Sequence, residues 1–119
     1  MLIYTPDGFV SALLMAPGRP HLGGAGSTDG TPDQFKKAGS GFIGYSGRYK
    51  VDEVKAAVTH QPLVAFSSDM LGNNQKRLVE LNGDVLVLTA EHTQPVGSAV
   101  AKSQLEWVRV KASQPEEDR

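Results

Sequence analysis

The sequence contains no cysteine, and this absence excludes several kinds of chemistry. Disulfide bonds, thiol nucleophiles and cysteine-ligated zinc or iron–sulfur clusters all need that side chain. Histidine is also scarce, and His21, His60 and His92 are too scattered in the sequence to form a linear metal-binding motif. We therefore expect no bound metal.

Loops that hold phosphates or nucleophiles are missing as well. The glycine-rich segment from Pro17 to Thr31 is not followed by Lys-Ser or Lys-Thr, and it does not join a strand to a long helix. The run Gly39-Ser40-Gly41 lacks the spacing and the setting of a serine nucleophile elbow. The sequence therefore predicts no cofactor, and it predicts a simple loop for the glycine-rich segment.

Neither sign of charge dominates, and long apolar runs are absent. The chain has 12 basic and 13 acidic side chains, so it lacks the basic surface that displaces counterions from nucleic acid phosphates. The run from Phe9 to Pro17 is far shorter than the roughly 20 residues that a membrane-spanning helix needs. The first residues also lack the basic and apolar regions of a signal peptide. We expect no nucleic acid partner, no membrane association and a cytoplasmic location.

What the sequence does contain is enough for one folded domain. It has 119 residues, of which 39% are hydrophobic and 21% are charged. This composition is typical of globular proteins and too apolar for a disordered chain. We expect one domain over residues 1–112 and a charged tail over residues 113–119.

Short segments with alternating apolar and polar residues predict a fold made of strands. Pro6 to Gly8 predict a tight turn, Asn82-Gly83 predicts a hairpin, and Pro62 is predicted to end a strand. One short helix is predicted to begin after a Thr31 cap and to end at Gly39 to Gly41. The seven predicted strands are Met1–Thr5, a strand that begins at Phe9, Ile43–Asp52, Val54–His60, Gln75–Leu81, Val85–Thr89 and Gln104–Lys111. Neighbouring strands in such a meander close economically into a small antiparallel β-barrel.

Polar side chains at inward-facing strand positions are the candidates for function, because a buried polar group costs free energy unless a partner satisfies it. Arg77 presents a planar fork of donors that suits a carboxylate, an enolate or a phenolate on a ligand. The alternatives for Arg77 are an ion pair with Glu53 or Glu80, or contact with solvent. The ordinary pKa of a histidine lies near neutrality, so His60 suits a general acid or base. A hydrogen-bonded core histidine is the alternative.

Aromatic and amide side chains complete the candidate site. Tyr45, Tyr49 and Gln75 supply further hydrogen bonds. Trp107 supplies apolar surface, and simple core packing is its alternative role. The predicted ligand-binding residues are Tyr45, Tyr49, His60, Gln75, Arg77 and Trp107. If the protein is an enzyme, His60 and Arg77 are its predicted catalytic residues.

Several motifs resemble those of the lipocalin-like domain proteins of bacteria and fungi, some of which are encoded beside natural-product biosynthesis genes. The segment LIYTPDGFVSALLMAPGRP, from Leu2 to Pro20, is similar to the opening hairpin of that family. The segment FIGYSGRYKVDE, from Phe42 to Glu53, resembles its strand with two tyrosines around a glycine, here Tyr45, Gly47 and Tyr49. The later matching positions are His60, Gly72, Gln75, Arg77, Leu105, Trp107 and Arg109.

This resemblance implies a fold and raises a question about its edges. The implied fold is a small antiparallel lipocalin-like β-barrel of about seven to eight strands, with a meander topology and one short helix. Members of the family usually begin with a further strand that carries a Gly-x-Trp-like motif, whereas this chain starts at what would be the second strand. That difference implies a tighter seven-stranded barrel, a trimmed start, or exposed strand edges that form a homodimer.

Three functions fit these residues. The leading hypothesis is a binding module for a small, largely apolar molecule, of an aromatic or polyketide-like kind, in the barrel interior. The first alternative is a cofactor-free isomerase or cyclase acting on a natural-product intermediate, in which His60 moves protons and Arg77 stabilises negative charge on an oxygen. The second alternative is a structural or interaction protein that uses its open edge. The residues leave all three open.

Overall fold

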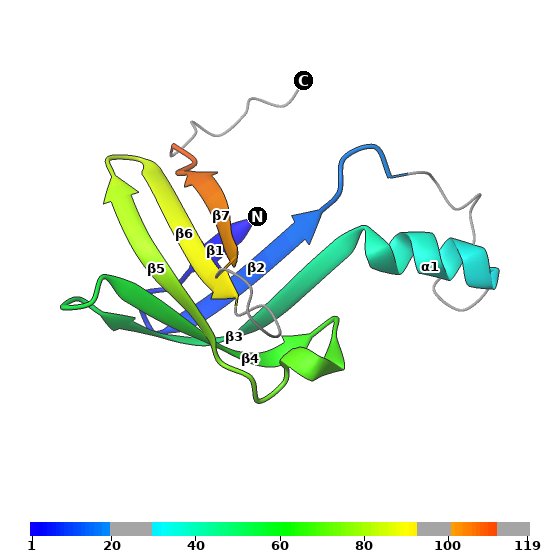
Figure 1. Ribbon diagram of the computed structural model, residues 1–119, viewed down its shortest axis with the longest axis horizontal. Coiled ribbons are helices and arrows are strands. Elements are labelled where there is room, and N and C mark those ends of the chain that lie inside the picture. The colour runs from blue at the N-terminus through cyan, green and yellow to red at the C-terminus, as the bar shows by residue number, and fades with distance from the viewer. Residues whose placement is uncertain (20–29, 93–100, 112–119) are drawn as a thin grey trace, which may run out of the picture. The chain divides into compact units, whose positions relative to one another are not determined.

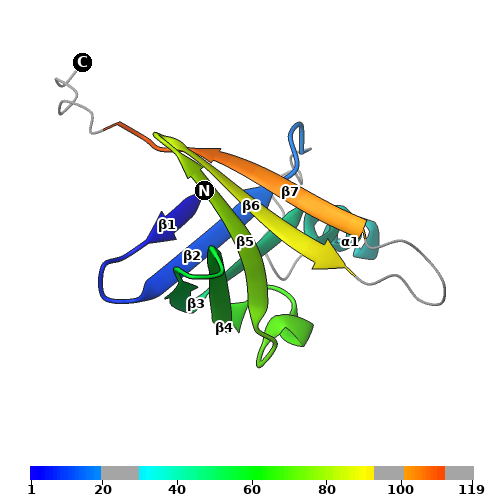
Figure 2. The same cartoon turned by 60° about the vertical axis from the view of Figure 1, so that its left-hand side comes forward.

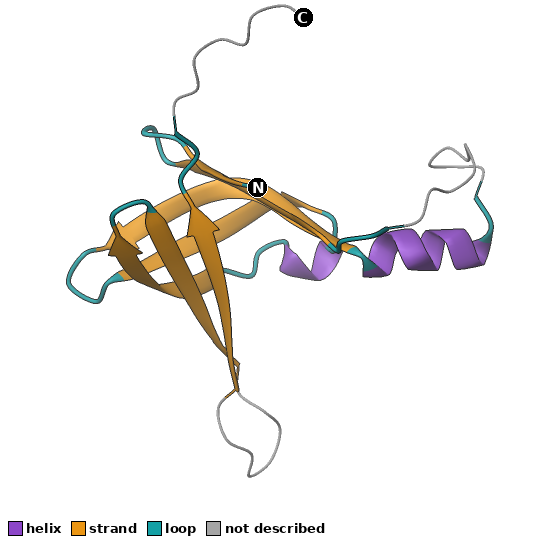
Figure 3. Cartoon of the chain, turned by 90° about the horizontal axis from the view of Figure 1, so that it is seen from above, coloured by secondary structure: helices purple, strands orange, loops and turns teal. Residues whose placement is uncertain are grey.

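The computed structural model describes residues 1–19, 30–92 and 101–111, and strands predominate among them (Figure 3). The elements are β1 (Leu2–Tyr4), β2 (Phe9–Met15), α1 (Pro32–Ser40), β3 (Phe42–Asp52), β4 (Ala57–Ala65), the 3-10 helix η1 (Ser68–Met70), β5 (Gln75–Asn82), β6 (Val85–His92) and β7 (Ala101–Val108). The strand order in the sheet follows the chain from β1 to β7 (Figure 1). The predicted all-β meander with one short α-helix is confirmed.

Parts of several predictions lie outside the described residues. They include His21, most of the glycine-rich segment and the whole of the charged tail. No helix within the described residues is long and apolar enough to cross a membrane.

The described residues divide into two compact units. The first unit comprises Met1–Tyr49 and His60–Gln75, and the second comprises Lys50–Thr59 and Lys76–Arg119. Strands β3 and β4 contribute residues to both units, because the boundaries fall inside these strands.

The first unit contains a three-stranded antiparallel sheet of β1, β2 and β3 with one buried face. Residues paired directly across strands share a face of a sheet. Val10 lies between Tyr4 and Gly47 in the register, and Ala12 lies opposite Tyr45. Val10 is 3% exposed and Ala12 is 6% exposed, so this face forms the core of the unit.

The predicted turn between the first two strands is confirmed. Gly8 has a φ of 96°, a left-handed conformation that glycine adopts without a steric penalty. The backbone amide of Gly8 donates to the carbonyl of Thr5 over 3.2 Å, and the amide of Thr5 donates to the carbonyl of Phe9 over 2.8 Å. These bonds close the hairpin that brings Tyr4 alongside β2.

The prediction for β4 was wrong at both ends. The predicted strand began at Val54, but a turn precedes β4: the Lys55 amide donates to Asp52 Oδ1 over 3.1 Å, and Ala56 has a φ of 49°. The predicted strand stopped before Pro62, but β4 continues to Ala65. The turn therefore moves the start of β4 to Ala57. The continuation of β4 past Pro62 depends on a contact with another strand.

Gly47 explains how β4 accommodates its proline. A Cβ atom placed on Gly47 would lie 1.9 Å from the carbonyl oxygen of Gln61 and 2.9 Å from the amide nitrogen of Leu63. The backbone on both sides of Pro62 thus lies against a position that has no side chain. The Phe66 amide then donates to the Gly44 carbonyl over 2.9 Å, beyond the end of the strand. Glycine at position 47 is required by this close approach of two backbones.

Alternation in the sequence predicts that Ile43 and Val51 share the inner face of β3 with Tyr45 and Tyr49, and that Ala57 lies on the outer face of β4. These predictions are wrong at three positions. Ile43 and Val51 are 44% and 60% exposed, and Ala57 is 2% exposed beside Val58 at 4%. Period-two alternation thus holds in the middle of β3 and fails near its ends and at the start of β4.

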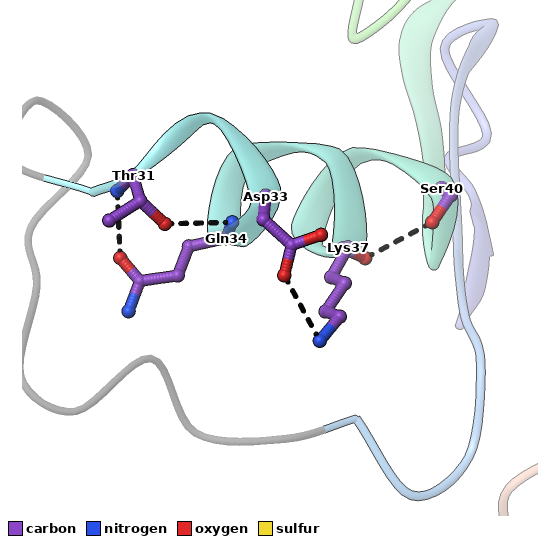
Figure 4. Close-up of polar contacts among 5 residues, drawn as sticks. All are labelled: Thr31, Asp33, Gln34, Lys37 and Ser40. Carbon is purple, nitrogen blue, oxygen red and sulfur yellow. Dashed lines mark hydrogen bonds and ion pairs between the residues drawn. The ribbon is translucent and has the colours of Figure 1, made fainter.

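Helix α1 has the predicted cap at its N-terminus (Figure 4). The Gln34 amide donates to Thr31 Oγ1 over 3.3 Å, and the Thr31 amide donates to Gln34 Oε1 over 2.8 Å, which is a capping box. Lys37 and Asp33 form an ion pair at 3.2 Å on the exposed surface of the helix. The helix ends at Ser40 and has no buried residue. The hydrogen bonds at its ends therefore contribute more to its stability than packing against the sheet does.

In the second unit, β5, β6 and β7 lie side by side as an antiparallel sheet (Figure 2). The hairpin predicted at Asn82-Gly83 is present, although its two-residue turn is Gly83-Asp84, because Asn82 pairs with Val85. Gly83 has a φ of 60°, as a tight hairpin requires. Two strands extend beyond their predicted limits, since β6 reaches His92 and β7 begins at Ala101; β7 ends earlier than predicted, at Val108.

Candidate functional site

The first unit contains a histidine that is almost completely buried. His60 in β4 is 1% exposed and is the largest fully buried side chain among the described residues. A polar ring in such a position is costly to bury unless both ring nitrogens find partners. Both of them do.

Two tyrosine hydroxyls hold the His60 ring from two other strands. Tyr4 Oη in β1 lies 2.6 Å from His60 Nε2, and Tyr45 Oη in β3 lies 2.5 Å from His60 Nδ1. The tyrosine rings lie at centroid distances of 5.5 Å and 5.7 Å from the imidazole, tilted by 60° and 55°. Three strands thus converge on one imidazole.

Tyr49 extends this arrangement. Its ring meets the Tyr4 ring edge to face, with centroids 4.9 Å apart and planes at 78°, a favourable geometry for aromatic pairs. Its hydroxyl donates to the backbone carbonyl of Thr5 over 2.7 Å. We call Tyr4, Tyr45, Tyr49 and His60 the tyrosine–histidine cluster. All three tyrosines are half-buried.

The hydrogen bonds of the cluster constrain where protons sit. A neutral imidazole donates from one nitrogen and accepts at the other. In either tautomer, therefore, one tyrosine hydroxyl donates to the ring and the other accepts from it. Tyr4, His60 and Tyr45 form a continuous hydrogen-bonded chain. If one hydroxyl takes up a proton from outside the chain and the other releases one, the imidazole changes tautomer and the two hydroxyls exchange their donor and acceptor roles.

The local sequence explains why the rings gather here. Tyr45 and Tyr49 lie on one face of β3, two residues to either side of Gly47. The adjacent positions on that face are small, since Ala12 lies opposite Tyr45 and Gly47 has no side chain. Small residues between large aromatic ones leave room for the rings and for the imidazole.

The structure brings together three of the predicted ligand-binding residues, namely Tyr45, Tyr49 and His60. Sequence reasoning did not assign Tyr4 to the site, although the residue lies in the predicted first strand and in the matching opening hairpin. A usable signal was present, because hairpin register places Tyr4 opposite Val10 on the buried face. Gln75, at the start of β5, also belongs to the first unit; it is half-buried, and its Nε2 donates to the Asn73 carbonyl over 3.0 Å.

The other two predicted residues, Arg77 and Trp107, belong to the second unit. Arg77 is half-buried on the less exposed face of β5, as its alternation predicted, and its Nη1 donates to the Lys76 carbonyl over 3.0 Å. Trp107 in β7 is half-buried and lies opposite Leu86. Its indole Nε1 is buried and, within the part of the chain that the structure describes, has no hydrogen-bond partner.

Comparison with known proteins gives a family match and one curated relative. Residues 1–110 match the lipocalin-like domain family. The chain is 28% identical over 104 residues to the 4'-hydroxy-3'-methoxypropiophenone carrier protein ppsC of Aspergillus oryzae, an alignment that covers 82% of this chain and 94% of that protein. No solved structure matches the chain.

Proposed function

Because the chain belongs to the lipocalin-like domain family, we propose that it binds a small, largely apolar aromatic molecule without changing it, as a carrier does. The tyrosine–histidine cluster provides the polar contacts in this proposal. The single observation that carries it is the burial of His60 between the hydroxyls of Tyr4 and Tyr45.

This cluster is a poor choice for stability alone. Filling a small core with apolar side chains is the simplest way to stabilise it, whereas a buried polar network must satisfy every member. Tyrosine offers a rigid ring for aromatic contact and a hydroxyl for a hydrogen bond. A half-buried group of tyrosines, two of which are oriented by His60, therefore suits a ligand that has both an aromatic ring and oxygen atoms.

The curated relative supports the same class of ligand. By its name, that protein carries a molecule with one aromatic ring, a hydroxyl group, a methoxy group and a ketone. Such a molecule is mostly apolar and has three oxygens for hydrogen bonding. We propose that this chain takes a ligand of related chemistry, an oxygen-bearing aromatic compound.

Calorimetric titration with 4'-hydroxy-3'-methoxypropiophenone tests the proposal. We expect saturable binding and a rise in melting temperature, equivalent to about 2.7 kcal/mol at a ligand concentration of 100 times Kd. Tyr45→Phe, which removes one hydroxyl of the cluster, should weaken binding about tenfold. Ser46→Ala is the matched control, because Ser46 lies next to Tyr45 but its hydroxyl donates to Ser11 Oγ over 2.9 Å. Absence of binding by this compound and by simpler aryl ketones would refute the proposal.

The isomerase or cyclase alternative has one specific observation in its favour. The chain from Tyr4 through His60 to Tyr45 is continuous, so a proton could pass between the two hydroxyls through the ring. In that alternative His60 moves protons, and the role of Arg77, which belongs to the second unit, stays a prediction from the sequence. Incubation of an aryl ketone in D2O distinguishes the two: an isomerase would exchange the hydrogens next to the carbonyl for deuterium, whereas a carrier returns the compound unlabelled.

A homodimer that pairs through exposed strand edges stays a prediction, as does the cytoplasmic location. Strand β1 has three residues and therefore offers a short edge for pairing. Sedimentation of the protein with and without ligand tests the dimer directly. A monomer in both conditions would exclude it.

A further inference from the structure

The indole N–H of Trp107 is a buried donor without an acceptor. Its Nε1 atom is shielded from solvent and has no hydrogen-bond partner within the described residues. Most buried polar groups in folded proteins are satisfied, because an unsatisfied one costs free energy. Phenylalanine is also an apolar aromatic residue and would not carry this cost, so the donor calls for an explanation.

The sheet of the second unit places leucine side chains beside Trp107 on its own face. Trp107 pairs with Leu86, which in turn pairs with Leu81. Two residues further along, Leu105 pairs with Leu88. Residues paired across strands, and every second residue along a strand, share a face. These leucine side chains contain no oxygen that could accept the indole hydrogen. In the other direction along the strands the same face carries Asp84 and Arg109, whose carboxylate and guanidinium groups pair with each other at 3.7 Å.

Two polar side chains of the same strand, Gln104 and Glu106, lie on the opposite face, whereas Ser103 lies on the face of Trp107, four residues away. Gln104 pairs with Thr89, and its Nε2 donates to Thr89 Oγ1 over 3.3 Å. Glu106, the residue before Trp107, pairs with Val87. Alternation along β7 thus directs Gln104 and Glu106 away from the indole.

We propose that the Trp107 indole N–H donates to the carbonyl oxygen of a bound small apolar ketone. This inference rests on the proposed function, since it requires that the chain bind a small apolar molecule, and it adds the functional group that the ligand must have. A carbonyl oxygen satisfies the donor, and the ligand's hydrocarbon part matches the apolar residues around it.

A matched pair of ligands isolates this contact. Propiophenone and propylbenzene differ only in that a carbonyl replaces a methylene group. We expect the natural protein to bind propiophenone at least about fivefold more tightly. Trp107→Phe should reduce that preference to about twofold or less. Any loss of packing in the variant affects both ligands, and the difference in hydration between the ligands is the same for both proteins. The change in the affinity ratio from the natural protein to the variant therefore reports the hydrogen bond.

A second measurement needs no substitution and guards against a variant that folds poorly. The chain has one tryptophan, so its indole N–H gives a single resonance in a 15N-labelled sample. Propiophenone should move the indole proton downfield, as hydrogen bonding does, relative to its position with propylbenzene. The ring-current effects of the two ligands are similar, and their difference reports the carbonyl.

The outcomes separate this inference from the proposed function. If Trp107→Phe keeps the full preference for propiophenone, or if both ligands shift the indole proton equally, the ketone contact is wrong while the binding function stands. If neither these compounds nor other aryl ketones bind the natural protein, the proposed function fails and takes this inference with it.

Discussion

His60 is fixed by groups that lie far from it in the sequence. Tyr4 is 56 residues away and Tyr45 is 15 residues away, yet both hydroxyls lie within 2.6 Å of the imidazole nitrogens. Each hydroxyl satisfies a ring nitrogen that water does not reach, because His60 is 1% exposed. The stability of the first unit should therefore depend on both tyrosine hydroxyls.

Removing either hydroxyl should destabilise the fold measurably. In Tyr4→Phe or Tyr45→Phe, one nitrogen of the buried imidazole loses its tyrosine partner, at an expected cost of about 1–3 kcal/mol each. Tyr49→Phe is the matched control, because its hydroxyl bonds a backbone carbonyl and not the imidazole; its expected cost is about 0.5–1.5 kcal/mol. The free energy of unfolding in urea measures all three.

The double variant Tyr4→Phe, Tyr45→Phe shows whether the two hydroxyls act together, which the single variants do not. Tyr4 and Tyr45 bond opposite nitrogens of one ring, so their effects should be coupled by more than about 0.5 kcal/mol. If the effects of the two single variants add within that margin, the hydrogen-bonded chain does not act as one unit. Such additivity would also remove the physical basis for proton transfer through His60.

At this scale, sequence could predict part of the site. Alternation along β3 placed Tyr45 and Tyr49 on one face, and the position of His60 on an apolar face also followed from local pattern. The partnership of His60 with Tyr4 did not follow, because it joins β1 to β4. No local periodicity encodes a contact between strands that are distant in the sequence.

At the scale of elements, one glycine determines how β3 and β4 approach each other. In Gly47→Ala the new methyl group would meet the Gln61 carbonyl at 1.9 Å. A backbone atom cannot rotate away as a side chain does, so the strands must separate. We expect a loss of about 3 kcal/mol or more in the free energy of unfolding, or failure to fold.

Gly39→Ala is the matched control for that substitution. Its new methyl group would lie 3.5 Å from the Phe66 ring, an ordinary contact. Alanine also favours helix over glycine by up to about 1 kcal/mol. We expect this control to be neutral or stabilising. Equal effects of the two substitutions would contradict the close approach at Gly47.

Helix α1 leads to a different prediction, because it buries no residue. Thr31→Ala removes the side-chain cap, which should cost the helix about 1 kcal/mol, equivalent to about a fivefold increase in local opening. Hydrogen exchange of the Phe35 amide, which donates to the Thr31 carbonyl over 3.0 Å, measures this local change. The global unfolding midpoint should stay the same.

Ser40→Ala is the control for Thr31→Ala, because it removes a side-chain hydrogen bond at the other end of the helix. Ser40 lies at the C-terminal end, where its hydroxyl donates to the Lys37 carbonyl over 3.3 Å, and its loss should leave exchange at Phe35 unchanged. A fall in the global midpoint of Thr31→Ala as large as its local effect would show that the helix unfolds together with the strands, contrary to the expectation.

The contrast between α1 and β4 shows what sequence can predict about elements. The helix start and the first hairpin depend on residues within a few positions of each other, and both were predicted correctly. The course of β4 past Pro62 depends on Gly47, a residue of another strand, and on the left-handed turn at Ala56. Proline therefore ends a strand reliably only where the neighbouring strand has no room for the backbone around the proline.

At the scale of the whole molecule, the two units share two continuous strands. Strand β3 passes from the first unit to the second after Tyr49, and β4 returns to the first unit at His60. Each unit is also small, and a core of that size rarely supplies more than about 3–5 kcal/mol alone. The units should therefore unfold together.

The chain contains natural probes that test this. Its one tryptophan, Trp107, lies in the second unit, and its three tyrosines, Tyr4, Tyr45 and Tyr49, all lie in the first. Tryptophan fluorescence and tyrosine absorbance followed through one urea titration should give the same midpoint and the same slope, as a two-state transition requires. If the tyrosine signal changes at a clearly different urea concentration, β3 and β4 do not couple the units, and ligand binding to one unit would leave the other unstabilised.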